Sequence, residues 1–394
     1  MADDWSPRGW RAFEARQQPV YADARALEEA LADFAGRTAL VPPAEIEASR
    51  SAVAEAAAGR AFILQAGDCA ESLDRPAAET AEATAALLHR LGDLLASASG
   101  RPVVRMARLA GQFAKPRSRD FETRSGTALP VYRGDAVNGA GFEADSRKPD
   151  PSRLVRAFDH SLASLAVLRR SNQPAPIYTA HEALLLPYEE ALVRRVEDRW
   201  YAGSGHFLWI GDRTRFDGSA HVEFARGLAN PIGLKCGPSL PPDRLLRLLE
   251  RLDPRRRAGR LTLIPRLGAE GVLEALPPLL RAVLREGHPV AWVCDPMHGN
   301  TLRSPDGRKT RSVERIAREV SGFFGACRAE GVRPAGLHLE LTARAVGECT
   351  GGPDTTGGGD YETLCDPRLN PSQAEAVVAV AASAMGSGRS PLAA

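Results

Sequence analysis

Eight short apolar segments recur along the chain, and each is followed at once or within a few residues by a side chain suited to catalysis or ligand binding. Helical patterns separate the segments, and this alternation is typical of a parallel sheet. In a parallel barrel the carboxyl ends of all strands meet on one face, where catalytic groups lie. The sequence therefore predicts an α/β fold, a (β/α)8 TIM barrel with one active site. The residues that close the segments are Cys69, Arg108, His181, Asp212 and Arg213, Lys235, Arg266, His298 and Glu340.

The predicted boundaries follow from hydrophobic periodicity. Strands are expected over 61–66, 103–107, 177–180, 206–210, 232–234, 261–265, 290–293 and 336–340. Helices are expected over 77–98, 152–170, 181–199, 242–252, 271–286, 312–330 and 370–382, and the polar stretch 119–151 is interpreted as an ordered substrate loop. Residues 1–60 hold two helical patterns, 22–34 and 43–58, without a catalytic motif. We therefore expect an N-terminal helical extension over 1–60 and a catalytic barrel over 61–394.

A doubly wound open sheet is the main alternative to the barrel. A dinucleotide fold of that kind needs a glycine-rich turn after its first strand. The first turn here reads Gly67-Asp-Cys-Ala-Glu71 and lacks that pattern, and no lysine followed by serine or threonine comes after the glycines near position 352 to form a phosphate-binding loop. Both observations favour the closed barrel.

Composition narrows the class of protein. The 51 basic and 49 acidic residues nearly balance, which argues against a nucleic-acid or membrane-surface partner. The first residues lack the pattern of a signal peptide, and no apolar run approaches the roughly 18 residues of a membrane span, so we expect a cytoplasmic protein. Six cysteines without close pairing are expected to be thiols or metal ligands. Only four basic residues are lysines, and Lys115 and Lys235 both lie in the motifs described below.

Four residues near predicted strand ends form a candidate metal site: Cys69, His298, Glu340 and Asp366. A thiolate, an imidazole and two carboxylates suit Mn²⁺, Co²⁺, Fe²⁺ or Zn²⁺ better than Mg²⁺ or Ca²⁺, which prefer oxygen ligands. Taken singly, each residue has a structural explanation, as a buried thiol, a loop histidine, an arginine-paired carboxylate or a helix cap. The interpretation as a metal site depends on their joint placement.

Cationic residues gather at the same predicted face. They are Arg108, Lys115, Arg117, Arg213, Lys235 and Arg266. Arginine binds carboxylate or phosphate through a planar fork, so this cluster predicts a small, multiply anionic and phosphorylated substrate. Surface salt bridges would explain most arginines of this chain, but they explain Lys235 and Arg266 poorly, because both end apolar strands.

Ten motifs carry a resemblance to a known family. In order they are QAGDCAES, RLAGQFAKPRS, YRGDAVNG, HEALLLPYEEAL, FLWIGDRTR, GLKCGPS, IPRLG, CDPMHGNT, GLHLELT and YETLCDPRLN. Together they resemble class II 3-deoxy-D-arabino-heptulosonate 7-phosphate (DAHP) synthases over about residues 60–375. The resemblance implies condensation of phosphoenolpyruvate (PEP) with erythrose 4-phosphate, the first step of the shikimate pathway. It also implies one divalent ion, Mn²⁺ or Co²⁺ first and Zn²⁺, Fe²⁺ or Cd²⁺ as alternatives, and a homo-oligomer, a dimer or tetramer.

The resemblance also implies roles for individual residues. The metal ligands are Cys69, His298, Glu340 and Asp366, and the catalytic residues are Lys235, Cys69 and His298. PEP is held by Arg108, Asp212, Arg213, Lys235 and Arg266, and erythrose 4-phosphate by Lys115, Pro116, Arg117 and Ser118. Asp212 departs from the family, where glutamate is more usual. A contact made by its backbone would be unaffected by the change, whereas a role of the shorter carboxylate is in doubt.

Some questions stay open at this stage. His181 either orients a neighbour or caps the helix that it begins, and we favour the cap. Cys365 is either a buried spectator or a thiol that oxidation joins to Cys69. The chain resembles short members of the family that serve secondary metabolism. The alternatives in function are an amino-DAHP synthase, which uses an imine-type sugar phosphate, and a non-catalytic paralogue that binds metal or sugar phosphate.

Overall fold

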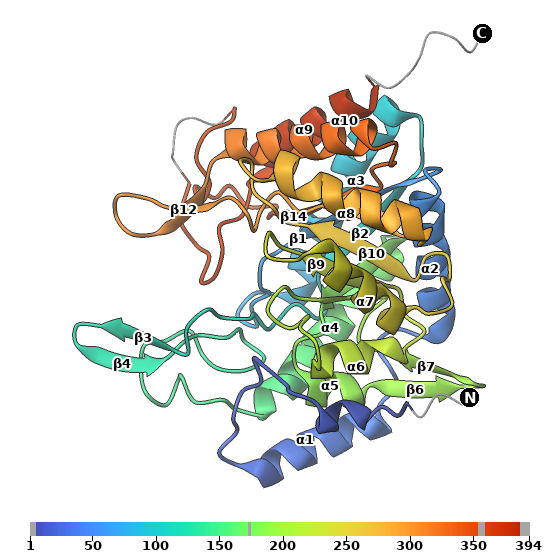
Figure 1. The fold of residues 1–394 in the computed structure, drawn as a ribbon. Coiled ribbons are helices and arrows are strands. Elements are labelled where there is room, and N and C mark those ends of the chain that lie inside the picture. The colour runs from blue at the N-terminus through green and yellow to red at the C-terminus, as the bar shows by residue number, and fades with distance from the viewer. Residues whose placement is uncertain (1–4, 172–174, 354–358, 387–394) are drawn as a thin grey trace.

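A computed structural model describes residues 5–171, 175–353 and 359–386 of the chain, and in this part eight parallel strands close into a barrel (Figure 1). Strands that follow each other in the chain are neighbours in the barrel, and β1 pairs with both β2 and β14 to close the ring. The predicted TIM barrel is therefore confirmed. Its strands are β1 (Phe62–Gly67), β2 (Val103–Arg108), β5 (Ile177–Glu182), β8 (Phe207–Ile210), β9 (Ile232–Cys236), β10 (Leu261–Pro265), β11 (Ala291–Cys294) and β14 (Gly336–Glu340).

A helix follows each barrel strand and packs outside it. In chain order these are α3 (Ala77–Ser99), α4 (Ser152–Arg170), α5 (Leu186–Ala191), α6 (Ala220–Arg226), α7 (Pro242–Leu252), α8 (Val272–Glu286), α9 (Val313–Ala329) and α10 (Pro371–Gly386). Helix α7 shows why these segments fold in this way. Its buried leucines at 245, 248, 249 and 252 have the spacing of one helical face, which the barrel covers.

The N-terminal helices η1 (Gly9–Ala12), α1 (Ala24–Gly36) and α2 (Pro43–Ala57) pack onto the barrel. Helix α2 lies at the end of the barrel where the strands begin (Figure 1) and packs against β1, β2, β8 and β11. Its Val53 and Ala56 share a buried cluster with Ile63 and Phe207 of the barrel interior. Residues among the first 60 positions therefore belong to the core that closes the barrel at the end where its strands begin.

The helix predicted over 181–199 is wrong. Strand β5 continues through His181 to Glu182, α5 is only six residues long, and a hairpin of β6 (Val193–Val196) and β7 (Arg199–Ala202) follows. Pro187 has no amide hydrogen and is tolerated only in the first turn of a helix, which places the helix start near it. The branched Val193 and Val196 favour the extended conformation that the hairpin supplies. Helix α6, which begins after the capping Ser219, was not predicted.

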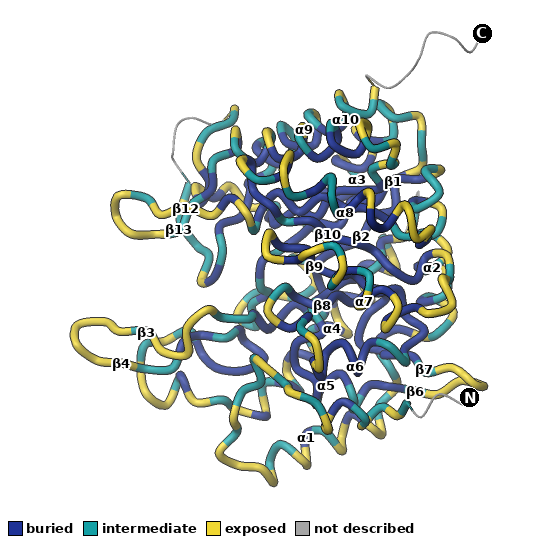
Figure 2. The backbone as a smooth tube through the Cα atoms, viewed as in Figure 1, coloured by how far each residue is buried: buried dark blue, intermediate teal, exposed yellow. Residues whose placement is uncertain are grey.

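Two further hairpins project beyond the carboxyl ends of the barrel strands, on the side opposite α2 (Figure 1). They are formed by β3 (Phe121–Arg124) with β4 (Thr127–Pro130), inside the predicted substrate loop, and by β12 (Thr301–Arg303) with β13 (Lys309–Arg311). The barrel strands are buried, whereas the tips of these hairpins are exposed (Figure 2). In the described part of the chain, no helix has both the length and the apolar character that crossing a membrane requires.

Candidate active site

A cavity opens at the carboxyl ends of the barrel strands. Five cationic side chains line it, together with three carboxylates and an imidazole. The lining residues are Arg108, Gln112, Lys115, Pro116, Glu182, Trp209, Gly211, Asp212, Arg213, Lys235, Arg266, His298 and Asp366. All five residues predicted to hold PEP lie on this cavity, although they come from four different strands or the loops after them. An excess of positive charge in an enclosed site favours a multiply anionic ligand.

Glu340, at the end of β14, is the most strongly paired carboxylate of the site. It is fully buried; its Oε1 accepts hydrogen bonds from Arg108 and from the Lys115 ammonium, both at 2.9 Å, and its Oε2 accepts one from Arg311 at 2.8 Å. Burial alone would raise the pKa of Glu340, but His298, Lys115 and Arg311 hold it well below its usual range. Glu340 therefore stays ionised and attracts cations.

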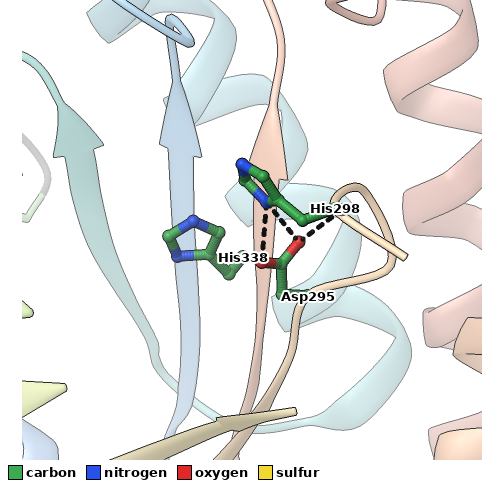
Figure 3. Close-up of side chains that lie close together, drawn as sticks. All are labelled: Asp295, His298 and His338. Atoms are coloured by element: carbon green, nitrogen blue, oxygen red, sulfur yellow. Dashed lines mark hydrogen bonds and ion pairs between the residues drawn. The ribbon is translucent and has the colours of Figure 1, made fainter. Parts of the chain in front are cut away.

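His298, Glu340 and Asp366 place ligand atoms within 4.8 Å of one another. The His298 ring lies with Nδ1 2.8 Å from Asp295 Oδ2 (Figure 3) and with Nε2 3.1 Å from Glu340 Oε1. A carboxylate on Nδ1 is the usual device that orients a metal-binding imidazole and leaves Nε2 free for the ion. The Lys115 ammonium, 2.9 Å from Glu340 and 3.2 Å from Asp366, already lies between the two carboxylates as a cation does. These residues fit a divalent metal ion.

A second group, Asp295, His298 and His338, also brings ligand atoms within 4.8 Å (Figure 3). It fits an ion less well, because both ring nitrogens of His338 have partners inside the barrel. Nε2 lies 2.6 Å from Arg108 Nη1, and Nδ1 lies 2.8 Å from Gln65 Oε1. We therefore place the candidate metal centre at His298, Glu340 and Asp366.

Cys69 is buried beside this centre and is not part of either group of ligand atoms. Its Sγ lies 3.4 Å from Thr363 Oγ1, and it lines a neighbouring cavity that Cys365 also lines. A hydrogen bond with Cys365 lowers the pKa of the Cys69 thiol, against burial, which raises it, while Lys115 lowers it further. The environment of Cys69 thus favours the thiolate, the form that binds metals.

Lys235, at the end of β9, carries a second buried ammonium of the site, besides that of Lys115. Its Nζ lies 2.5 Å from Asp295 Oδ2 and 5.8 Å from the centre of the Trp209 ring. Burial lowers the pKa of Lys235 to about 8, with Asp295 opposing the shift and Arg108 adding to it. A lysine in this state can bind an anion and also give up a proton near neutral pH.

The carboxylate of Asp212 does take part in the site. Its Oδ2 accepts a hydrogen bond from Arg266 at 3.1 Å, and its Oδ1 accepts one from the backbone of Gly237 at 3.1 Å and another from Arg215. Arg266 in turn donates to the His298 carbonyl at 2.7 Å. The shorter side chain at position 212 therefore still reaches and orients an arginine of the anion site.

We predict that Asp212→Asn raises the KM for PEP about tenfold, because a charge-assisted hydrogen bond that holds Arg266 is weakened. The kcat is expected to change by less than about threefold, a fraction of one hydrogen-bond energy, since Asp212 acts through Arg266. Steady-state kinetics of PEP consumption test this. Asp217→Asn, in an exposed carboxylate near Arg244 and Arg247, is the matched control.

The comparisons with known proteins identify the family of this chain. The family model described as the class-II DAHP synthetase family matches residues 5–175 and 171–382, which together are nearly the whole chain. The chain belongs to the class-II DAHP synthetase family. The resemblance carried by the ten motifs is thereby confirmed.

Two named relatives and one solved structure are similar to this chain. A "Phospho-2-dehydro-3-deoxyheptonate aldolase" of Streptomyces coelicolor is 40% identical over 422 residues, covering 92% of this chain and 94% of the relative. A "Probable phospho-2-dehydro-3-deoxyheptonate aldolase" of Pseudomonas fluorescens is 45% identical over 371 residues, covering 92% and 93%. The solved phospho-2-dehydro-3-deoxyheptonate aldolase of Francisella tularensis covers 96% of this chain and 100% of its own, with a TM-score of 0.54. At 14% identity it supports the fold alone.

The residues predicted to hold erythrose 4-phosphate lie on the loop after β2. Lys115 and Pro116 line the cavity, Arg117 is partly buried and Ser118 is exposed. The N-terminal segment holds this loop, because Gln17 exchanges hydrogen bonds of 2.8 and 3.1 Å with the backbone of Arg117. Residues 1–60 were predicted as a helical extension without a catalytic motif, and no motif marks Gln17.

The favoured prediction for His181, a helix cap, is wrong because no helix begins there. The residue lies inside β5, and its Nε2 is 2.8 Å from Oε1 of the buried Glu189, whose Oε2 accepts a bond from Ser204. His181 thus orients a neighbour, which is the less favoured of its two predicted roles. Its own Nδ1 has no partner among the described residues.

Several residues of the site were missed. Asp295 directly follows β11 within the motif CDPMHGNT, so its position at a strand end was a usable signal. Glu182 ends β5 but was placed in the incorrectly predicted helix 181–199. Burial raises the pKa of Glu182, and the charges of Lys115 and Lys235 oppose this shift. Arg311 lies on β13, a hairpin strand that hydrophobic periodicity does not reveal.

Proposed function

We propose that this protein condenses PEP with D-erythrose 4-phosphate and water to give DAHP and phosphate, with one divalent metal ion bound. The single observation that carries the proposal is the joining of five cationic side chains and a candidate metal centre in one barrel cavity. PEP has a carboxylate and a phosphate, and erythrose 4-phosphate has a second phosphate. Both substrates therefore need cationic side chains in the same cavity at the carboxyl ends of the barrel strands.

In the proposed reaction the arginines at 108, 213 and 266 and Lys235 bind the carboxylate and phosphate of PEP and fix its orientation. C3 of PEP attacks the aldehyde carbon of the sugar phosphate, water adds at C2, and phosphate leaves. Lys235 holds a proton at Nζ that it can deliver within the site, in addition to its role as an anion ligand. The fixed charges pre-organise the site for the charge that develops.

His298, Glu340 and Asp366, with Cys69 beside them, would hold the metal ion. When bound, the ion supplies a Lewis acid for the aldehyde oxygen. The mixed nitrogen, oxygen and sulfur set favours Mn²⁺ or Co²⁺, with Zn²⁺, Fe²⁺ and Cd²⁺ as alternatives, and affinity together with metal supply decides among them.

The assay that tests the proposal follows PEP consumption with erythrose 4-phosphate and added Mn²⁺ or Co²⁺, with and without a chelator. Turnover that the chelator abolishes and that added metal restores is the expected result. Turnover only with an imine-type sugar phosphate would instead identify an amino-DAHP synthase. Bound metal without any turnover would indicate a non-catalytic binding protein.

A further part of the proposal concerns regulation and setting. Because the chain resembles short forms that serve secondary metabolism, we predict that phenylalanine, tyrosine and tryptophan inhibit it weakly. Rates measured with each amino acid at increasing concentration test this, and strong inhibition in the micromolar range would contradict it. A cytoplasmic location and a dimer or tetramer also belong to the proposal, and light scattering of the purified protein tests the oligomeric state.

Oxidation is expected to inactivate the enzyme through Cys365. This thiol lies next to Asp366 in sequence and shares a buried cluster and a cavity with Cys69, so a disulfide between the two would remove a proposed metal ligand. We predict that mild oxidant inactivates the wild type and releases metal, whereas Cys365→Ser keeps its activity. Cys327→Ser, in a buried thiol of α9, is the control. Equal inactivation of wild type and Cys365→Ser would show that Cys365 is a spectator.

A further inference from the structure

A buried carboxylate of helix α9 contacts the loop that carries Arg266. Glu319 is only 1% exposed, and its Oε1 accepts hydrogen bonds from the backbone amides of Leu267 and Gly268 at 2.8 and 2.9 Å. These two residues directly follow Arg266 in the loop after β10. From a helix outside the barrel, Glu319 therefore holds the loop that places an arginine in the cavity.

Asn300 extends this contact to the loop after β11, which carries His298. The Asn300 Nδ2 donates to Glu319 Oε2 at 2.7 Å and to the Pro296 carbonyl at 2.8 Å. Its Oδ1 accepts a hydrogen bond of 3.0 Å from the amide of Ala269, in the loop after β10. Asn300 lies two residues after His298 and is 1% exposed. Glu319 and Asn300, which we call the loop clamp, thus join both loops in one buried network.

The backbones of the two loops also touch each other. A Cβ atom at Gly299 would lie 2.3 Å from the amide nitrogen of Gly268, and Gly268 itself has a φ of +81°, which favours glycine. Arg266 donates to the His298 carbonyl at 2.7 Å from one loop to the other. Close-packed interiors transmit strain, so a displacement of one loop displaces the other. The position of Arg266 is therefore tied to that of His298.

The buried position of the Glu319 carboxylate is unfavourable for its charge. Burial raises the pKa of Glu319 to about 7, and the charge of Asp295 adds to this shift. The amides of Leu267 and Gly268 oppose the shift. An apolar side chain would avoid the cost of burying a charge, but it could not accept the three hydrogen bonds that order the loops. A satisfied buried network of this kind fixes one arrangement of the groups that it joins.

We propose that Glu319, acting through Asn300, is a positioning residue that holds Arg266 of the anion site and His298 of the candidate metal centre in one geometry. This inference rests on the proposed function, which assigns these two residues to PEP and to the metal ion. Neither residue of the loop clamp is among those that line the cavity, so both act through the loops that they hold. Partners behind a metal ligand orient it, and their loss weakens metal binding about 10- to 100-fold.

The test measures two affinities by titration calorimetry, that for Mn²⁺ and that for PEP in the absence of metal. Glu319→Gln keeps the size of the side chain but turns an amide donor towards a donor of the clamp, which removes one hydrogen bond. We expect the Kd for Mn²⁺ and the Kd for PEP each to rise about tenfold. At saturating Mn²⁺ the KM for erythrose 4-phosphate should stay within about threefold, less than the effect of one charged hydrogen bond. The reason is that the loop after β2, which carries Lys115, is held by a different carboxylate, Glu71.

A second variant and a control complete the design. Asn300→Ala cuts the loop clamp from the other side and should raise the same two Kd values. Combined with Glu319→Gln, it should add less than its separate effect, because both residues belong to one network. Asp253→Asn is the matched control, in a buried carboxylate that accepts a hydrogen bond of 2.6 Å from the Arg257 amide before β10 begins. This control should lower the melting temperature and leave both Kd values as in wild type.

Other outcomes overturn the inference. A lower melting temperature in Glu319→Gln with both Kd values unchanged would mean that Glu319 only stabilises the fold, and a rise in one Kd alone would mean that the loops are positioned independently. If Glu319→Gln does not fold, Asn300→Ala is judged by the same two Kd values. If wild type binds Mn²⁺ and PEP but does not consume PEP with erythrose 4-phosphate, the proposed function fails and the two Kd values still decide the role of Glu319. Wild type that does not bind Mn²⁺ or PEP would overturn both.

Discussion

Replacing His298 with alanine is expected to abolish metal binding and to reduce turnover about 10³-fold, because loss of a Lewis acid removes several kcal/mol of transition-state stabilisation. The ring is the nitrogen donor of the candidate centre, with Nε2 3.1 Å from Glu340 Oε1. Its side chain is only 21% exposed and bonds the buried Asp295 carboxylate at 2.8 Å, so truncation also opens buried space and removes a hydrogen bond. We therefore expect a loss of about 1–3 kcal/mol of stability, smaller than that of Glu340→Gln, measured by thermal unfolding.

Glu340→Gln provides the informative contrast. It also removes a candidate metal ligand, but it leaves Arg108, Lys115 and Arg311 buried around a neutral amide. Breaking such a buried pair costs about 3–5 kcal/mol, so this variant should lose both metal binding and thermal stability. Calorimetric titration with Mn²⁺ and thermal unfolding separate the two effects. His89→Ala, in a histidine of α3 that bonds the Ser171 carbonyl, is the control. Full Mn²⁺ affinity in His298→Ala would remove this residue from the metal centre.

Most strand ends were predictable because the barrel strands are largely apolar runs with a polar residue at or soon after their last position. Arg266 follows β10 directly, and Lys235 lies in the last two residues of β9, so the apolar pattern alone places both at the mouth of the barrel. The apolar pattern also placed Asp212 at a strand end, but it did not show which part of this residue contacts the site. Whether its carboxylate or its backbone mattered depended on the position of Arg266, which is 54 residues away.

Other parts of the site depend on contacts that no local pattern contains. Glu182 was hidden because the segment after His181 has helical composition, whereas strand pairing with β8 keeps it extended. His338 is a polar residue inside an apolar run, and only barrel closure brings it within 2.6 Å of Arg108. Lys309 lies on a short, exposed hairpin without hydrophobic periodicity, so its place beside Asp366 is a product of tertiary structure.

Lys235→Met is expected to reduce kcat/KM for PEP by at least about 10²- to 10³-fold, because truncating one partner of a buried charge pair costs about 2–5 kcal/mol. The Lys235 side chain is only 6% exposed. Its loss would leave the partner Asp295 with a buried charge near His298. The loss should appear in the KM for PEP whatever else Lys235 does, since an anion ligand disappears. Arg285→Met, in the last turn of α8 away from the cavity, is the control for the mutation as such.

The pH profile distinguishes the two roles of this lysine. Burial lowers the pKa of Lys235 to about 8, so the ammonium that we propose binds the anion exists below that pH and is lost above it. In wild type, kcat/KM for PEP should therefore fall as the pH rises through about 8, because this ratio reports groups of the free enzyme. Lys235→Met should lack that limb. If Lys235 also transfers a proton, kcat at saturating PEP falls in the variant as well. A kcat equal to that of wild type, together with a lost affinity for PEP, would confine Lys235 to binding.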